Sequence, residues 1–333
     1  MTSITLTIAF PTYNRKDAVT QRVRELRDAG IPEQVKILVS DNASSDGTVE
    51  ALHDLGIGSS QFDILTGAEN MGYAGNFLKV VSAVETDYIL VCSDEDSIDP
   101  SQINAYIEWL DQESPDYAVP QAIIDGKVYR GRLSQGEVIA PEFQRSSFYI
   151  SGLTFKADYA RGCVPRIREI LHKNEAALIY PQVLLAAVII VHGRALWYPK
   201  PITVKSAQLK SHISGSDGEP YNGLVGRYRQ SLGYLAFFDE LIAETGEVSG
   251  KRSCILEMQE EVQRNMFKVV RNAVKTDRPD LIAAFDKGCL EYCLGRVIPG
   301  RKVMGLGLRS IKDPPALLRF MKRRVMKRVD KKK

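Results

Sequence analysis

The N-terminal part of the chain alternates short, β-rich apolar runs with helical segments, and this alternation limits the possible folds more than any other feature. The apolar runs cover residues 4–10, 35–40, 62–65 and 88–91. Strands that alternate with helices predict a parallel α/β sheet. A polar, turn-forming cluster follows each run. Because open parallel sheets bind ligands beyond the carboxyl ends of their strands, these clusters predict a nucleotide site at one sheet edge.

The fourth run leads into a cluster of carboxylates formed by Asp94, Glu95 and Asp96. Carboxylates this close repel one another unless a cation lies among them. Mg²⁺ and Mn²⁺ prefer oxygen ligands and commonly bind through one or two carboxylates plus substrate phosphates. The alternative is a solvated acidic turn that leads into a helix capped by Asp99, with Pro100 at its first position.

Four motifs in this region resemble the successive signatures of family 2 glycosyltransferases with the GT-A fold. They are Pro11-Thr12-Tyr13-Asn14-Arg15, Asp41-Asn42-Ala43-Ser44-Ser45-Asp46-Gly47-Thr48, Asn70-x-Gly72-x-x-Gly75-Asn76 and Ser93-Asp94-Glu95-Asp96. The last motif, with serine before the acids, is most similar to the abequosyltransferase-like branch. The resemblance implies a Rossmann-like, mixed but mainly parallel GT-A sheet flanked by helices, followed by a helical C-terminal region.

The resemblance also implies which residues bind a nucleotide-diphosphate sugar donor. Asp41 matches the acid that accepts a hydrogen bond from the ring N–H of the base. Tyr13 offers an aromatic face, and Arg15 offers a charged donor toward phosphate. Ser151 and Gly152, in a segment similar to the family's floor strand (residues 148–158), would lie beneath the donor sugar. The full set of implied nucleotide-binding residues is Pro11, Tyr13, Arg15, Asp41, Asn42, Asn70, Gly72, Asn76 and Asp94.

In the family, an aspartate–any–aspartate motif binds the divalent ion that bridges the donor phosphates, which here implies Mn²⁺ or Mg²⁺. We expect Asp96 to bind the metal and Asp94 to lie near the ribose. Glu95 is the competing ligand, because a second register of the motif puts it in a ligand position. His212, in a Gly- and Ser-rich segment, is a further candidate ligand, with a solvent-exposed loop histidine as the alternative. The ion would neutralise charge on the departing nucleoside diphosphate.

An inverting transferase also needs a general base that accepts the proton of the acceptor hydroxyl. The family's acidic pair falls at residues 180–184, where this sequence has Tyr-Pro-Gln-Val-Leu and no acid. The nearest carboxylates are Glu175 and Asp158, and we rank Glu175 first. The alternative is that each is a surface or capping residue.

Length and composition predict a globular enzyme with a full core, since the 333 residues include 44% hydrophobic and 26% charged side chains. We expect a GT-A domain over residues 1–223, a helical region over 224–313 and a basic amphipathic tail over 314–333. The chain enters its first strand directly, which predicts no signal peptide. Its longest apolar run, residues 183–191, is shorter than a membrane span.

The tail concentrates positive charge. After Pro315 there are nine Lys and Arg and one Asp, a net charge of +8; because the whole chain carries +3, the remainder carries −5. Leu318, Met321, Val325 and Val329 share one helical face, which is typical of a basic helix on an anionic membrane surface. No aromatic or groove-reading motif accompanies it, so we expect no nucleic-acid partner. A solubilising tail is the alternative.

The resemblance, together with these features, implies an inverting, metal-dependent glycosyltransferase of cell-surface polysaccharide synthesis. As in the family, we expect it to act on a glycan or polyprenyl-linked acceptor at the cytoplasmic face of the inner membrane. A nucleotidyltransferase would need a Gly-rich phosphate loop after the first strand, where this chain has Pro11-Thr12-Tyr13-Asn14. A catalytically silent, sugar-nucleotide-binding scaffold subunit stays open because the acidic pair is missing.

Deletion of residues 315–333 is expected to release the protein from anionic vesicles, because each basic residue near such a surface adds about 1 kcal/mol. Co-sedimentation with vesicles that contain phosphatidylglycerol measures this, and vesicles of phosphatidylcholine alone are the control. Equal binding by the full-length and truncated proteins would contradict the membrane role, and loss of folding would make the tail structural.

Overall fold

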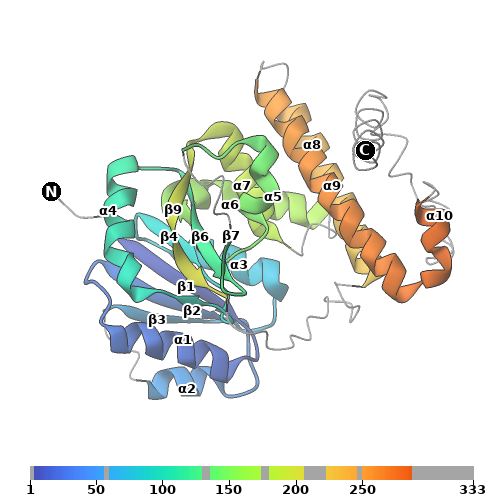
Figure 1. Cartoon of the computed structure of the whole chain (residues 1–333). Helices are drawn as coiled ribbons and strands as arrows, with labels where there is room; N and C mark the ends of the chain where they lie inside the picture. Colours follow the sequence, from blue (N-terminus) through green and yellow to red (C-terminus); the bar gives the residue numbers. More distant parts are fainter. Residues whose placement is uncertain are drawn as a thin grey trace.

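The computed structural model describes residues 4–55, 60–129, 136–173, 180–205, 223–245 and 250–286. They form a central sheet between two layers of helices, followed by a long helical hairpin (Figure 1). The expected fold class, a mixed, mainly parallel sheet flanked by helices with a helical C-terminal region, is confirmed. The expectations for Glu175, His212 and the tail over residues 314–333 lie outside the described residues.

The strands and helices alternate through the first half of the chain, as the sequence predicts. The strands are β1 (Leu6–Thr12), β2 (Val35–Asp41), β3 (Phe62–Thr66), β4 (Tyr88–Val91), β5 (Ser97–Ile98), β6 (Tyr117–Ile124), β7 (Lys127–Tyr129), β8 (Leu153–Lys156) and β9 (Ala195–Val204). The α-helices are α1 (Lys16–Ala29), α2 (Thr48–Asp54), α3 (Gly72–Ala83), α4 (Ile103–Glu113), α5 (Phe143–Ser147), α6 (Ala157–Lys173), α7 (Pro181–His192), α8 (Leu224–Thr245), α9 (Lys251–Asp277) and α10 (Ile282–Asp286).

The strand order β3-β2-β1-β4-β8-β6-β9-β5 brings one set of strand ends to a single edge. β1 pairs in parallel with β2 and β4, and β2 pairs in parallel with β3. β8 runs antiparallel to both β4 and β6, and β9 runs parallel to β6. The carboxyl ends of β1 to β4, β6 and β9 therefore meet the amino end of β8. We call this the site edge.

β1 continues through Pro11 to Thr12, which is longer than the sequence predicts. The β1–β4 ladder ends at Ala9, whose carbonyl accepts from the Cys92 N–H at 2.9 Å. Main-chain groups two residues apart on a strand point the same way, so the main chain of Pro11 faces the β4 side, as that of Ala9 does. β4 has already ended at this level, so the missing N–H of Pro11 breaks no hydrogen bond of the sheet. The last residue, Thr12, pairs in register with Asp41.

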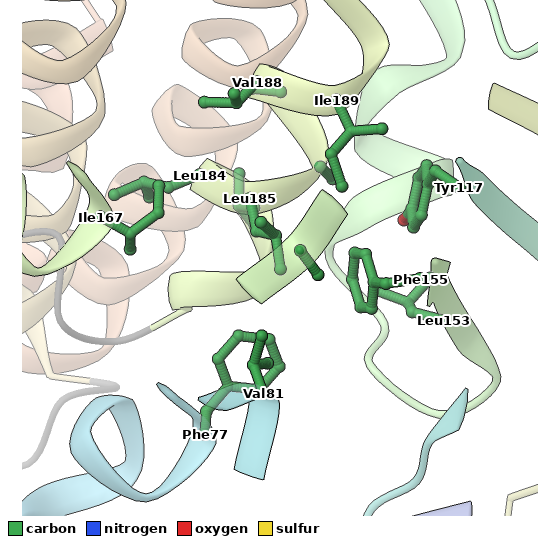
Figure 2. Packing of buried hydrophobic residues seen from close by; sticks show 14 of the residues in the cluster. Phe77, Val81, Tyr117, Leu153, Phe155, Ile167, Leu184, Leu185, Val188 and Ile189 are labelled. Atoms are coloured by element: carbon green, nitrogen blue, oxygen red, sulfur yellow. The ribbon is translucent and has the colours of Figure 1, made fainter. Parts of the chain in front are cut away.

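Alternate residues of the central strands face opposite layers of helices. Ile8 belongs to the core that β1 and β2 form with α1, α2 and α4. Ala9 belongs to the core shared with α3, α6 and α7. Figure 2 shows this second core, in which Phe77 and Leu185 from two helices lie close to Phe155 of β8. Both faces of the sheet are buried, which explains why its strands are continuous apolar runs.

The helical hairpin of α8 and α9 is packed on α5 and α7 rather than on β1 to β3 (Figure 1). The rings of Phe143 and Phe238 meet edge to face with centroids 6.0 Å apart. Tyr234, Phe238 and Met258 belong to the same continuous hydrophobic cluster as Phe77 of α3. The hairpin therefore extends the core of the sheet, and only its far end, around Phe285, forms a separate small cluster.

One segment differs from the family strand that it resembles. The segment over residues 148–158 is a strand only at Leu153–Lys156, and Asp158 lies in the first turn of α6. The apolar run over residues 183–191, which is too short for a membrane span, lies within the buried helix α7. Within the ranges that the structure describes, none of the helices is both long and apolar enough to cross a bilayer.

Substitution of Phe155 by Ala is expected to lower the free energy of unfolding by about 3–5 kcal/mol, because the ring is fully buried. The centroid of the Phe155 ring lies 5.0 Å from that of the Tyr117 ring and 6.5 Å from that of the Phe77 ring. Urea denaturation measures the change. Leu256→Ala, at a position 44% exposed, is the control and should change stability by less than about 0.5 kcal/mol. Similar values for both variants would contradict this core assignment.

Candidate functional site

The carboxylate cluster after β4, which we call the acid turn (Ser93–Asp96), lies between the end of β1 and the loop that enters β8. Asp94 is bound from the β1 side. Thr12 Oγ1 donates to its Oδ2 at 2.7 Å, and Arg15 Nη1 lies 3.2 Å from its Oδ1. Burial raises the pKa of Asp94 to about 6, although Arg15 and the Thr12 hydroxyl favour the charged form. Asp94 therefore links the acid turn to β1 and α1.

Asp96 is bound from the opposite side, by the loop that the sequence identifies as the sugar floor. Ser151 Oγ donates to Asp96 Oδ2 at 2.6 Å, and Tyr149 Oη donates to the same oxygen at 2.8 Å. The Ser93 N–H donates to Ser151 Oγ at 3.0 Å. Ser151 therefore lies beside the acid turn, and the buried Asp96 carboxylate fixes this loop to the turn.

Glu95 is the most accessible carboxylate of the three, with a side chain 25% exposed. It accepts a hydrogen bond from Arg15 Nη1. The sequence ranks Asp96 first as metal ligand, with Glu95 as the competing ligand. In the structure Asp96 is buried and accepts hydrogen bonds from two hydroxyls, whereas Glu95 is the more exposed of the two. Among the described residues, no three His, Cys, Asp or Glu side chains converge on a possible ion. A divalent ion therefore fits here through Glu95 plus oxygens that a bound diphosphate supplies.

Asp41, at the end of β2, has an unsatisfied acceptor. Its Oδ2 accepts from the Ser44 N–H at 2.9 Å. Its Oδ1 is buried and has no hydrogen-bond partner among the described residues, while Asp41 as a whole is 1% exposed. A buried acceptor without a donor is costly, so this oxygen is suited to an N–H group of a ligand.

Asn42 and Asn70 organise the loop that follows β3. Asn42 Nδ2 donates to Asn70 Oδ1 at 2.7 Å and to the Gly72 carbonyl at 3.2 Å, and Asn42 Oδ1 accepts from the Met71 N–H at 3.0 Å. Gly72 has φ +70°, a conformation that favours glycine. The structure therefore brings these predicted residues together, and it uses the Asn42 side chain to shape the loop.

Asn76, buried at the start of α3, ties the strand ends together. Its Nδ2 donates to the Ser40 carbonyl at 2.9 Å and to the Thr12 carbonyl at 3.4 Å. Ser40 Oγ donates to Asn76 Oδ1 at 2.6 Å. Because the Asn76 amide is bound by Ser40 and Thr12, its role is to hold the ends of β1 and β2 together at the site edge. Tyr13, by contrast, is 43% exposed.

Gly152 marks a close approach of backbone at the floor. Its φ is +91°, and a Cβ atom there would lie 3.0 Å from Pro120 Cγ. Its N–H donates to the Val91 carbonyl at 2.9 Å, which continues the β4–β8 pairing up to the acid turn. Glycine is therefore required by the fold at this point, whether or not a sugar lies above it.

The structure places Asp158, the second candidate base, away from the acid turn. β8 runs antiparallel to β4, with Lys156 opposite Tyr88, so Asp158 lies at the far end of β4 from the acid turn. The four residues of β4, which separate Asp158 from the acid turn, span about 13 Å at about 3.3 Å per residue. The Asp158 side chain is 87% exposed and pairs with Arg161.

The start of α7, where the resemblance places the family's acidic pair, carries no acid. Gln182 is fully buried. Tyr73 Oη donates to Gln182 Oε1 at 3.4 Å, and Gln182 Nε2 donates to the Phe148 carbonyl at 3.4 Å. Gln182 therefore connects α7 to α3 and to the floor loop.

Two contributors to the site, Thr12 and Tyr149, are absent from the sequence prediction as ligand or support residues. Thr12 lies inside the first motif, and its position next to Pro11 was the available signal. Tyr149 could be found only through the antiparallel return of β8 beside β4, because nothing local links a tyrosine to a carboxylate 53 residues away.

Comparison with known proteins shows the family of the chain. A family model described as Glycosyl transferase family 2 matches residues 7–174, which contain the acid turn and the floor. The abequosyltransferase RfbV of Salmonella typhimurium is 28% identical over 115 residues, which is 34% of this chain and 34% of that protein. The alignment thus covers well under half the length of this curated relative.

Solved structures share the fold over most of the chain. S. aureus TarS 1–349 in complex with UDP-GlcNAc has a TM-score of 0.60 at 12% identity, covering 89% of this chain and 82% of that one. The mannosyltransferase PcManGT from Pyrobaculum calidifontis, in complex with GDP-Man and Mn²⁺, has a TM-score of 0.53 at 14% identity, covering 86% and 80%. At these identities the likeness shows the fold alone.

The raised pKa of Asp94 predicts a pH dependence of stability. Between the ordinary value of 3.8 and about 6, the unfolded chain has released this proton while the folded protein retains it. The contribution of Asp94 to the free energy of unfolding therefore falls as pH rises through that window, by about 3 kcal/mol at most. Urea denaturation of the wild type and Asp94→Asn at pH 4 and pH 7, with a chelator present, measures the difference. Parallel pH profiles would contradict it.

Proposed function

Because the chain belongs to glycosyl transferase family 2, we propose that it is an inverting glycosyltransferase with a nucleotide-diphosphate sugar as donor. The acceptor is a glycan or a polyprenyl-linked saccharide of cell-surface polysaccharide synthesis. The relatives that support this are an abequosyltransferase and structures in complex with UDP-GlcNAc or GDP-Man.

One observation carries the proposal: a buried, partnerless Asp41 Oδ1 lies at the same sheet edge as the acid turn. Thr12 connects them, since it pairs in register with Asp41 and donates to Asp94. An N–H of the nucleoside base satisfies Asp41 Oδ1. Tyr13 is exposed on the loop between β1 and α1 and offers an aromatic face to the base. The diphosphate then extends toward the acid turn.

We place Mn²⁺ or Mg²⁺ at Glu95, where it supplies neutralisation of the charge that develops on the leaving diphosphate. Asp94 and Asp96 hold Glu95 in position through their contacts on either side. PcManGT, whose structure contains Mn²⁺ with GDP-Man, supports a metal in this fold. His212 stays a candidate further ligand outside the described residues.

The reaction is a single displacement in which the acceptor hydroxyl attacks the anomeric carbon over the floor formed by Ser151 and Gly152. The hydroxyl proton passes to a base as the new bond forms. With Asp158 at the far edge and Gln182 buried, Glu175 is the proposed base. It lies in the chain between α6 and α7, and α7 begins beside Tyr73 at the site edge.

We also propose that the basic tail after Pro315 holds the enzyme at an anionic membrane surface on the cytoplasmic face of the inner membrane. The charge of the tail supports this. A silent sugar-nucleotide-binding scaffold is the second candidate, favoured only by the buried Gln182 at the start of α7. Turnover separates the two.

Donor hydrolysis and transfer assays with UDP-, GDP-, CDP- and dTDP-sugars, with and without Mn²⁺, test the function. We expect at least one donor to turn over, and Glu95→Gln to lower kcat/KM by about a hundredfold or more. Binding without turnover across all donors would favour the scaffold. Full activity of Glu95→Gln would show that Glu95 does not bind the metal.

Glu175→Gln is expected to lower kcat about a hundredfold to ten-thousandfold while donor KM stays nearly constant, because only proton transfer is lost. Asp158→Asn is the matched control, since it removes an exposed carboxylate at the far edge. Initial rates with saturating acceptor measure both. Loss of activity in Asp158→Asn, with Glu175→Gln unaffected, would reverse the assignment.

A further inference from the structure

The acid turn has a cation of its own. Arg15 Nη1 lies 3.2 Å from Asp94 Oδ1 and also donates to Glu95 Oε1. Arg15 directly precedes α1, and its side chain is 22% exposed. The guanidinium therefore neutralises part of the carboxylate cluster in the protein alone.

The backbone that carries Arg15 is held on both sides. The Asn14 N–H donates to Ser44 Oγ at 2.8 Å, and Asn14 Oδ1 accepts from the Ser45 N–H at 2.8 Å. After Arg15, the Lys16 N–H donates to Asp46 Oδ2 at 2.9 Å. These contacts fix the loop between β1 and α1 to the loop after β2. The partly exposed guanidinium can change partner while its backbone stays in place.

A divalent ion on Glu95 and a guanidinium on the same carboxylate repel each other. A diphosphate removes this conflict, since its oxygens accept from the planar fork of an arginine and also coordinate the ion. We propose that Arg15 is a resident counter-ion of Glu95 that transfers to the donor diphosphate, so that the divalent ion and the nucleotide bind as a pair. The inference rests on the proposed metal position at Glu95.

This arrangement makes binding of the two ligands cooperative. In the protein alone, Arg15 competes with the ion for Glu95 and weakens its binding. With a nucleoside diphosphate present, Arg15 has a new partner and the ion binds more tightly. By linkage, the ion raises the affinity for the diphosphate by the same factor.

The first measurement is Mn²⁺ binding to the full-length protein without nucleotide, followed by electron paramagnetic resonance. Arg15→Gln is expected to bind Mn²⁺ about tenfold more tightly than the wild type, because the competing guanidinium is gone. Arg24→Gln is the matched control. It removes the same charge from an exposed position within α1, the helix that Arg15 precedes, and should leave Mn²⁺ affinity unchanged.

The second measurement is the affinity for UDP, CDP and GDP by calorimetry, with and without Mn²⁺. In the wild type, Mn²⁺ should raise the affinity for at least one of them about tenfold, and in Arg15→Gln this enhancement should shrink at least about fivefold. Arg15→Lys keeps the charge but not the fork and should retain part of the enhancement.

The outcomes separate this inference from the proposed function. Tighter Mn²⁺ binding in Arg15→Gln, with a smaller enhancement, supports the counter-ion role. Equal or weaker Mn²⁺ binding in Arg15→Gln than in the wild type overturns it, while the metal site stands. If neither protein binds Mn²⁺ in any condition, the metal position at Glu95 is itself wrong, and the inference falls with it.

Discussion

The site depends on one buried carboxylate. Asp94 joins the turn after β4 to β1 through Thr12 and to α1 through Arg15, within 3.2 Å on both oxygens. A buried carboxylate is stable only when such partners replace its hydration. Without these contacts, the Glu95 carboxylate would have no fixed position between β1 and the floor loop. The neighbouring Asp96, bound by Tyr149 and Ser151, completes a turn that is fixed from two sides, and Glu95 remains the accessible acid between them.

The same logic explains why the chain's three adjacent acids are not equivalent. Spacing along the sequence suggests a pair of metal ligands. In the fold, Asp94 and Asp96 are buried and hydrogen-bonded to neighbouring protein groups. A site with one accessible carboxylate and a resident arginine is incomplete for a divalent ion until phosphate oxygens arrive. Asp41, with its partnerless Oδ1, is incomplete in the same sense at the nucleoside end. Both ends of the proposed donor site thus depend on the ligand for their last interactions.

Much of the first half was predictable because its signals are local. The strands β1 to β4 are apolar runs that end in turn residues, and their parallel order places those ends at one edge. The rest depends on non-local pairing. β9 contains Pro199 and Pro201, which hide a strand from pattern reasoning, and its register with β6 shifts beside Pro120 and Gln121 to accommodate them. The direction of β8, which separates Ser151 from Asp158 by a strand length, follows from its antiparallel pairing with β4 and not from any local pattern.

The most direct test is a crystal structure of the full chain with Mn²⁺ and the nucleotide sugar that the enzyme turns over. We expect a base N–H within hydrogen-bond distance of Asp41 Oδ1 and the diphosphate beside Glu95. Thr12 should still be bound to Asp94, with the floor loop beneath the sugar. A nucleotide bound elsewhere, or one bound at this edge that leaves Asp41 Oδ1 without a partner and the acid turn remote from the phosphates, would contradict it.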